Sequence, residues 1–239
     1  MRIVCPPDSG SLFFNYKNFF SVVLLAVIDA NYKFMFVDVG SYGKEGDSGI
    51  FDKSELGRKF SSGDMFPPPQ KLPKTDVVLP HVFVGDEAFR LHPNMMKPYS
   101  KPVASADKEK AIFNYRLSRA RRVSENAFGL ASKVFRVFYT PIALKPSTTD
   151  NLIVVACCLH NLLRDAYLES NKKPYYEMDT SQMPPSENFT ALARGGGFAN
   201  AEGFAVRDAF TEYFNSRAGQ VPWQSSYVTR TNLGYIAIQ

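Results

Sequence analysis

The stretch that decides the fold is SVVLLAVIDANYKFMFVDV, residues 21–39. Its first part, Ser21–Asp29, is apolar nearly throughout and rich in branched side chains, which is typical of a strand covered on both faces. Its second part, Tyr32–Val39, alternates more between apolar and polar side chains, and Asn31 lies at the turn between the two parts. We therefore predict an antiparallel pair of strands.

Downstream of this pair the pattern changes from strands to helices. A glycine-rich loop, GSYGKEGDSGIF, follows directly and carries Gly40, Gly43, Gly46 and Gly49. The further predicted elements are a short helix over Asp52–Phe60, a strand over Val77–Val84 that Pro80 and His81 interrupt, and helices over Asp107–Ala131, Thr149–Leu168 and Ala205–Ser216. An antiparallel pair and a further strand followed by helices predict a mixed α/β or α+β fold.

The chain is expected to consist of one domain with an appendage. Residues 1–168 form the domain, and residues 169–204 are polar, carry a run of three glycines and are predicted to be a loop or linker. Residues 205–239 form a tail that packs on the domain, with Trp223 in the patch that docks it. A partner-binding patch is the alternative for Trp223.

Composition and length exclude several classes of protein. With 239 residues, 45% of them hydrophobic, the chain can bury a core, so wholesale disorder is excluded. The longest apolar run, Phe19–Ile28, is about half of what a membrane-spanning helix needs, and we expect no membrane association. An odd count of three cysteines, two of them adjacent, is no disulfide framework and favours a reducing compartment.

Positive charge is concentrated in one segment. The whole chain has a net charge of +5, whereas residues 108–145 carry nine basic residues and two acids, a net charge of +7. Such a basic stripe is the electrostatic footprint of a polyanion site, although a solvated helix face gives the same pattern. Arg121 and Arg122 lie one turn before Glu125 on the polar side of the predicted helix.

Three carboxylates are candidate metal ligands. Asp86 follows a predicted strand, Asp47 lies in the glycine-rich loop, and Glu125 lies on the basic helix. If they converge, they offer the oxygen ligands that Mg²⁺ prefers, and two such ions stabilise the attacking and leaving oxygens of a phosphodiester. The alternatives are a turn cap for Asp86, loop solvation for Asp47, and an ion pair between Glu125 and Arg121 or Arg122.

Several motifs together carry a resemblance to a known family. They are the block at 11–56 with its GDS turn, HVFVGDEAFRLHPNMMKPYS at 81–100, FNYRLSRARRVSENAFGLASKVFRVF at 113–138, IVVACCLHNLL at 153–163, and YFNSRAGQVPWQ at 213–224. With these motifs the chain resembles the DDE superfamily endonucleases of the PIF/Harbinger type, a transposase-derived nuclease family. The resemblance covers residues 2 to about 168.

This resemblance implies an RNase H-like fold, a mixed sheet flanked by helices, here with a helical C-terminal tail. It implies a divalent metal cofactor, Mg²⁺ or Mn²⁺, and hydrolysis of phosphodiester bonds in DNA. Asp86 and Glu125 match the second and third catalytic acids, and Asp47 matches an additional metal ligand. With Glu125 at the metals, Arg121, Arg122 and Arg136 would flank the path of the DNA backbone.

The chain departs from the family pattern at the first catalytic acid. In the family that acid precedes the segment written here as Arg2–Cys5, so we expect an N-terminally truncated chain with an incomplete first strand. Asp38 is the only nearby substitute. The alternative function is therefore a catalytically inactive, domesticated or fragmentary remnant that binds DNA or protein.

The resemblance also bears on partners, location and the cysteines. It implies DNA as the partner, a Myb-like DNA-binding protein as a further partner, and the nucleus as the location, with the cytoplasm as the alternative. Cys157, Cys158 and His160 are of metal-ligand type, but adjacent cysteines on a helix point about 100° apart. We therefore predict that they pack in the core.

Overall fold

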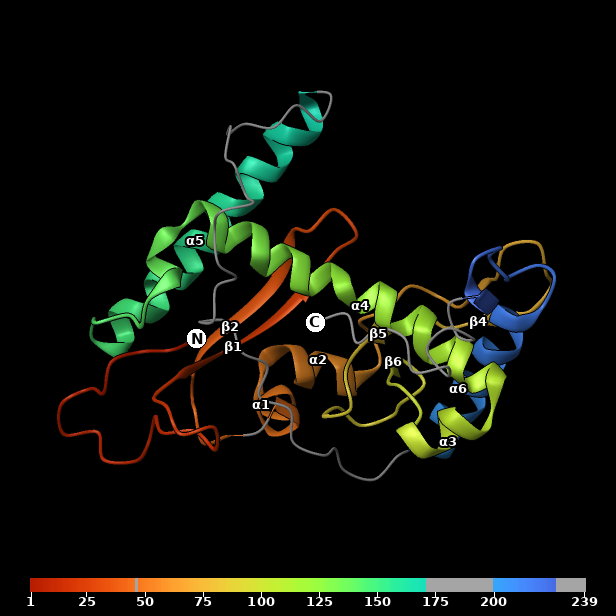
Figure 1. The fold of residues 1–239 in the computed structure, drawn as a ribbon, viewed down its shortest axis with the longest axis horizontal. Coiled ribbons are helices and arrows are strands. Elements are labelled where there is room, and N and C mark those ends of the chain that lie inside the picture. The colour runs from red at the N-terminus through yellow and green to blue at the C-terminus, as the bar shows by residue number, and fades with distance from the viewer. Residues whose placement is uncertain (46, 171–199, 227–239) are drawn as a thin grey trace. The chain divides into compact units, whose positions relative to one another are not determined.

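The computed structural model describes residues 1–45, 47–170 and 200–226 (Figure 1). Within these ranges the side chains of Asp47 and Ser48 are outside the description. Most of the predicted linker at 169–204 and the end of the predicted tail lie outside the described residues. Contacts divide the chain into two units, the first formed by Met1–Gly57 and Val123–Leu192, the second by Arg58–Arg122 and Ala193–Gln239.

The first unit contains the predicted antiparallel pair. Strands β1 (Val22–Ile28) and β2 (Phe34–Tyr42) form a hairpin in which Leu25 lies opposite Asp38. The first residues of the chain extend this pairing, because Arg2 forms an antiparallel bridge with Ser21 and Ile3 a parallel bridge with Ile142. The sequence pattern therefore predicted this hairpin correctly.

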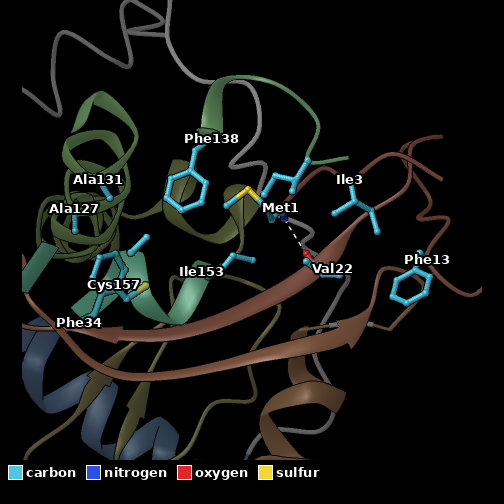
Figure 2. Packing of buried hydrophobic residues seen from close by; sticks show 12 residues of the cluster. Met1, Ile3, Phe13, Val22, Phe34, Ala127, Ala131, Phe138, Ile153 and Cys157 are labelled. Carbon is cyan, nitrogen blue, oxygen red and sulfur yellow. Dashed lines mark hydrogen bonds between the residues drawn. The ribbon is translucent and has the colours of Figure 1, made fainter. Parts of the chain in front are cut away.

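The core of the first unit lies between the hairpin and two helices, α4 (Lys108–Val134) and α5 (Pro146–Glu169). Figure 2 shows Phe34 and Val22 of the hairpin facing Ile153 and Cys157 of α5. The small residues Ala127 and Ala131 let α4 approach closely. The Met1 amino group, drawn with a dashed line, donates to the Val22 carbonyl at 2.9 Å. Further members of the cluster are Met1, Ile3, Phe13, Phe138, Ile142 and Ala156.

Side chains of α5 fasten the turn of the hairpin through its backbone. Asn161 makes two hydrogen bonds to one residue: its Oδ1 accepts from the Phe34 N–H at 2.8 Å, and its Nδ2 donates to the Phe34 carbonyl at 2.9 Å. His160 Nε2 bonds the Tyr32 carbonyl at 2.7 Å, and Arg164 Nε donates to the Asn31 carbonyl at 3.0 Å. The helix thus satisfies backbone groups that strand pairing leaves open.

The second unit has a core of its own, formed by the first half of α4, α3 (Lys101–Ala106) and α6 (Ala201–Asn215). Phe113 and Leu117 of α4 pack against Phe210 and Phe214 of α6. Gly203 allows α6 to approach closely, since a Cβ there would lie 3.0 Å from the backbone of His92. The remaining buried members are Leu91, Met96, Tyr99 and Ala104.

The helix predicted over Asp52–Phe60 is two helices, α1 (Asp47–Lys53) and α2 (Glu55–Ser62). Ser54 separates them: its hydroxyl donates to the Phe51 carbonyl at 2.7 Å and accepts from the Gly57 N–H at 2.9 Å. A hydroxyl that accepts a hydrogen bond from the backbone N–H of the third residue after its own is typical of a helix N-cap. Ser54 is therefore the N-cap of α2. The hydrophobic pattern carried no sign of this break.

The strand predicted over Val77–Val84 is also two elements. Strand β4 (Val78–Leu79) pairs antiparallel with β3 (Gln70–Lys71), and β5 (Phe83–Val84) pairs parallel with β6 (Met95–Met96). Pro80 lies between them and has no N–H for a continuous ladder. The described residues thus form three two-stranded sheets with helices. The mixed α/β class is confirmed, whereas a single RNase H-like sheet stays a prediction.

The long helices were predicted correctly, with shifts at their ends. Helix α5 begins at Pro146 and α6 at Ala201, three and four residues earlier than predicted. On α4, Phe113, Leu117, Ala127 and Ala131 are buried, whereas Ala120 is exposed. In the described part of the chain, no helix combines the length and hydropathy needed to cross a membrane.

Replacing Asn161 with Ala should lower the free energy of unfolding by about 2–3 kcal/mol, because two hydrogen bonds are lost and the Phe34 backbone is left unpaired. Denaturant unfolding measures this change. The matched control is Asn151→Ala, an exposed position on the same helix, which should change stability by less than about 0.5 kcal/mol. Equal effects of both variants would show that the clamp contributes nothing.

His160 should make the protein less stable in mild acid. The ring is fully buried, its Nε2 donates to the Tyr32 carbonyl, and its Nδ1 has no partner among the described residues. Burial lowers the pKa of His160 below its usual 6.5, with nearby Arg164 a smaller cause in the same direction. Below pH 6.5 the unfolded state therefore binds a proton that the folded state rejects, and stability falls as pH falls.

Unfolding measured from pH 7.5 to pH 5 should show this loss in the wild type and a smaller loss in His160→Gln. One proton limits the difference in slope to about 1.4 kcal/mol per pH unit. Burial also lowers the pKa of His92 and of the Met1 amine, so part of the slope should remain in the variant. Identical slopes in the two proteins would rule out this role for His160.

Candidate functional site

Asp86 lies in a tight turn just after β5. Gly85 donates its N–H to the Met96 carbonyl at 2.9 Å and is buried, and a Cβ there would lie 2.8 Å from the ring of Phe89. Asp86 is half-buried, and its Oδ1 accepts a hydrogen bond from the Ala88 N–H at 2.9 Å. The turn therefore fixes the direction of this carboxylate through one of its two oxygens.

Lys97 is the cation beside this turn. Its ammonium donates to the carbonyls of Phe89 at 3.0 Å and Glu87 at 3.2 Å. Burial lowers the pKa of Lys97, as does Arg207, whereas Glu87 and Asp86 act in the opposite direction. Sequence reasoning missed Lys97, because its approach to Asp86 depends on the parallel pairing of β5 with β6, and β6 was not predicted. Lys97 thus connects the backbone of this turn to the residue that follows β6.

Tyr99, in the segment that follows β6, connects this segment to α6. Its hydroxyl donates to Asp208 at 2.6 Å and shares a hydrogen bond with Thr211 at 2.9 Å. The guanidinium of the buried Arg207 lies 3.8 Å from the Tyr99 ring centroid. Burial raises the pKa of Tyr99, and the bond to Asp208 raises it further. The phenol therefore stays protonated as a fixed donor, and its role is to hold α6.

Asn114 of α4 holds the backbone of Tyr99 in the way that Asn161 holds Phe34. Its Oδ1 accepts from the Tyr99 N–H at 2.8 Å, and its Nδ2 donates to the Tyr99 carbonyl at 2.9 Å. These two bonds give Asn114 a structural role.

The basic face of α4 is accessible to solvent. Arg122 and Glu125 are exposed and Arg121 is half-buried, at the one-turn spacing that the helix imposes. Arg136 is exposed at the start of a short 3₁₀ helix, η1 (Arg136–Tyr139). These side chains can therefore meet a large ligand without rearrangement of either core.

The predicted acids belong to different units. Asp86 belongs to the second unit, whereas Glu125 and Asp47 belong to the first, with Asp47 at the first position of α1. Asp38, the suggested substitute for the first acid, lies on β2 and is half-buried. Among the described side chains, no group of three His, Cys, Asp or Glu residues is placed to hold a metal ion. The three-carboxylate cluster stays a prediction.

The cysteines do not form a metal site with His160. Cys157 is buried in the core, and burial raises the pKa of its thiol to about 12, so the thiolate that metals require is not formed at neutral pH. Cys157 and His160 are both buried, which confirms core packing for these two residues. Cys158 is exposed, so the prediction was wrong for this residue, because adjacent positions on a helix face different directions.

Comparison with known proteins adds to this geometry. A family model described as DDE superfamily endonuclease matches residues 1–161. The Arabidopsis thaliana protein named Protein ALP1-like is 26% identical over 174 residues, which cover 69% of this chain and 40% of the relative. The chain thus matches about two fifths of the length of that curated relative. No solved structure gives a significant match.

Proposed function

Because the chain belongs to the DDE superfamily endonucleases, we propose that it is a divalent-metal-dependent DNA endonuclease of the Harbinger transposase-derived type. The observation that carries this proposal is the extent of the family match, which includes Asp47, Asp86 and Glu125. An RNase H-like arrangement of the strands, with these acids brought together, is part of the proposal.

The chemistry of the donor set fits a hard divalent cation. All three candidate ligands are carboxylates, the groups that Mg²⁺ and Mn²⁺ favour. Asp86 supports this assignment most directly, since Oδ1 is engaged by the Ala88 N–H and Oδ2 accepts no hydrogen bond from the described residues. When bound, the metal would supply Lewis-acid stabilisation of the phosphodiester and a more acidic water.

The protein's own contribution is to position groups. The turn after β5 holds the Asp86 carboxylate, and Lys97 lies close enough to interact with its charge. Glu125 lies on the exposed face of α4, where it can reach a ligand bound over that face.

The DNA backbone would lie along the basic face of α4. Arg121 and Arg122 lie one turn before Glu125, and Arg136 follows the end of the helix. Arginine forms bidentate contacts with phosphate, which position DNA without reading its sequence. Recognition of a particular site would then require a DNA-binding partner, for which a Myb-like protein in the nucleus is part of the proposal.

Asp86→Asn should abolish binding of Mn²⁺ at the site and cleavage of supercoiled plasmid DNA, and Glu125→Gln should abolish cleavage. Losing a metal-binding carboxylate removes both the ligand and its charge. Titration calorimetry measures binding, and gel electrophoresis measures cleavage. The matched control is Glu87→Gln, which removes one negative charge from the exposed neighbour of Asp86 and should leave both activities near wild type.

Equal Mn²⁺ binding by wild type and Asp86→Asn would contradict the proposed metal site. A chain that binds DNA but neither binds Mn²⁺ nor cleaves plasmid would instead be the non-catalytic DNA-binding remnant, the rival function.

The double variant Arg121→Ala, Arg122→Ala should bind duplex DNA more weakly and with a flatter salt dependence. Each lost phosphate contact reduces the slope of log affinity against log salt by about 0.9, so the slope should fall by up to about 2. Fluorescence anisotropy over a range of salt concentrations measures both quantities. The control pair Lys101→Ala, Lys108→Ala removes two exposed charges outside the proposed path and should preserve the slope. An unchanged slope in the arginine variant would place the DNA elsewhere.

A further inference from the structure

The second unit contains a cavity that the proposed metal and DNA contacts do not use. This cavity is shallow and open to solvent, with a volume of about 360 Å³. Helix α4, the end of α6 and the segment after α6 contribute its lining, which consists of Arg116, Arg119, Ala120, Phe214, Val221 and Trp223. Ala120 contributes a small, exposed side chain to this lining.

The cavity is electropositive. Arg116 is held in place, since its Nη1 donates to the Gly219 carbonyl at 3.0 Å and to Gln224 Oε1 at 3.1 Å. Its pKa is lowered by burial and also by the charge of Arg119, so the two guanidinium groups lie close enough to repel each other. Arg119 donates to the hydroxyl of Tyr115 at 3.1 Å. Within the described residues, neither arginine forms an ion pair with a carboxylate, and the cavity therefore attracts an anion.

The cavity also presents an open aromatic face. Trp223 is 51% exposed, which is high for the largest apolar side chain, and the Arg119 guanidinium lies 5.8 Å from its ring centroid. The ring of Phe214 contacts the other arginine: its centroid lies 4.6 Å from the guanidinium of Arg116. A ligand that fills this space meets an indole and two cations at once.

A nucleotide has the matching chemistry, a planar aromatic base joined to a phosphate. Base stacking on an aromatic side chain, with arginine beside it, is the physical basis of binding to single-stranded DNA. Bases in a duplex are stacked on one another and present no face to Trp223. We propose that this cavity binds an unpaired DNA base on Trp223 with its phosphate on Arg119. This assignment rests on the proposed DNA-directed function and extends it to unpaired DNA.

Trp223 is the only tryptophan of the chain, so the tryptophan fluorescence of the protein reports on binding in this cavity alone. A short oligothymidylate should quench its fluorescence to saturation, whereas an oligomer of equal length that carries abasic sites should bind with little quenching. The two probes have the same phosphates and differ in the bases alone. The full chain is used throughout.

Trp223→Ala should weaken oligothymidylate binding by about 5- to 100-fold in fluorescence anisotropy and leave binding of the abasic oligomer nearly unchanged. Arg119→Ala should weaken binding of both probes and reduce the salt slope by about 0.7. Lys108→Ala, an exposed charge on the same helix away from the cavity, is the matched control and should preserve the slope. Circular dichroism melting verifies that each variant is folded.

Oligothymidylate that binds without quenching Trp223, or quenching that abasic DNA matches, would overturn the assignment. Quenching by an acidic, tyrosine-containing peptide and none by oligothymidylate would also overturn it, in favour of a protein partner. Duplex binding through Arg121 and Arg122 is measured separately, so loss of the cavity assignment leaves the proposed endonuclease intact. Absence of all DNA binding would instead refute the proposed function together with its extension.

Discussion

The first unit depends on a pair of hydrogen bonds between an asparagine side-chain amide and the backbone N–H and C=O of a single residue. We call this pair of bonds a clamp. Asn161 offers one acceptor and one donor at the spacing of a neighbouring strand, and Phe34 uses both. Asn114 makes the same pair of bonds to Tyr99 in the second unit. In each case the two bonds fix a helix to another segment of the chain. Without them, buried polar groups would lack hydrogen-bond partners, and this loss destabilises a fold by more free energy than the bonds contribute to it. The two clamps hold the hairpin on α5 in the first unit and the segment after β6 on α4 in the second.

Helix α4 carries two functions on opposite faces. Small and apolar residues, such as Ala127 and Phe113, pack into the cores, and this packing fixes the rotation of the helix about its axis. The polar face, with Arg122 and Glu125, is then presented to solvent. On a helix without a packed face, rotation about the helix axis would be free, and basic side chains would have no fixed orientation. The clamp at Asn114 and the small side chains toward the core thus orient the charges on which DNA binding is proposed to depend.

The sequence predicted those parts of the fold that hydrophobic periodicity controls. The hairpin and the long helices follow from period and composition, because burial decides them. The break at Ser54 and the division of the strand at Pro80 depend on single hydrogen-bonding groups, which periodicity does not register. Of the candidate site, sequence identified Asp86 and Glu125 through motifs, whereas the contact of Lys97 with the Asp86 turn depends on a parallel pairing of two residues per strand.

The proposed endonuclease function requires that the carboxylates of Asp86 and Glu125 share a divalent metal ion. Diffraction from crystals of the full chain grown with Mn²⁺, recorded at a wavelength where manganese scatters anomalously, locates the ion directly. The proposed metal site predicts an anomalous peak about 2 Å from a carboxylate oxygen of each residue. Electron density that shows the two carboxylates far apart, with manganese at neither, would contradict it.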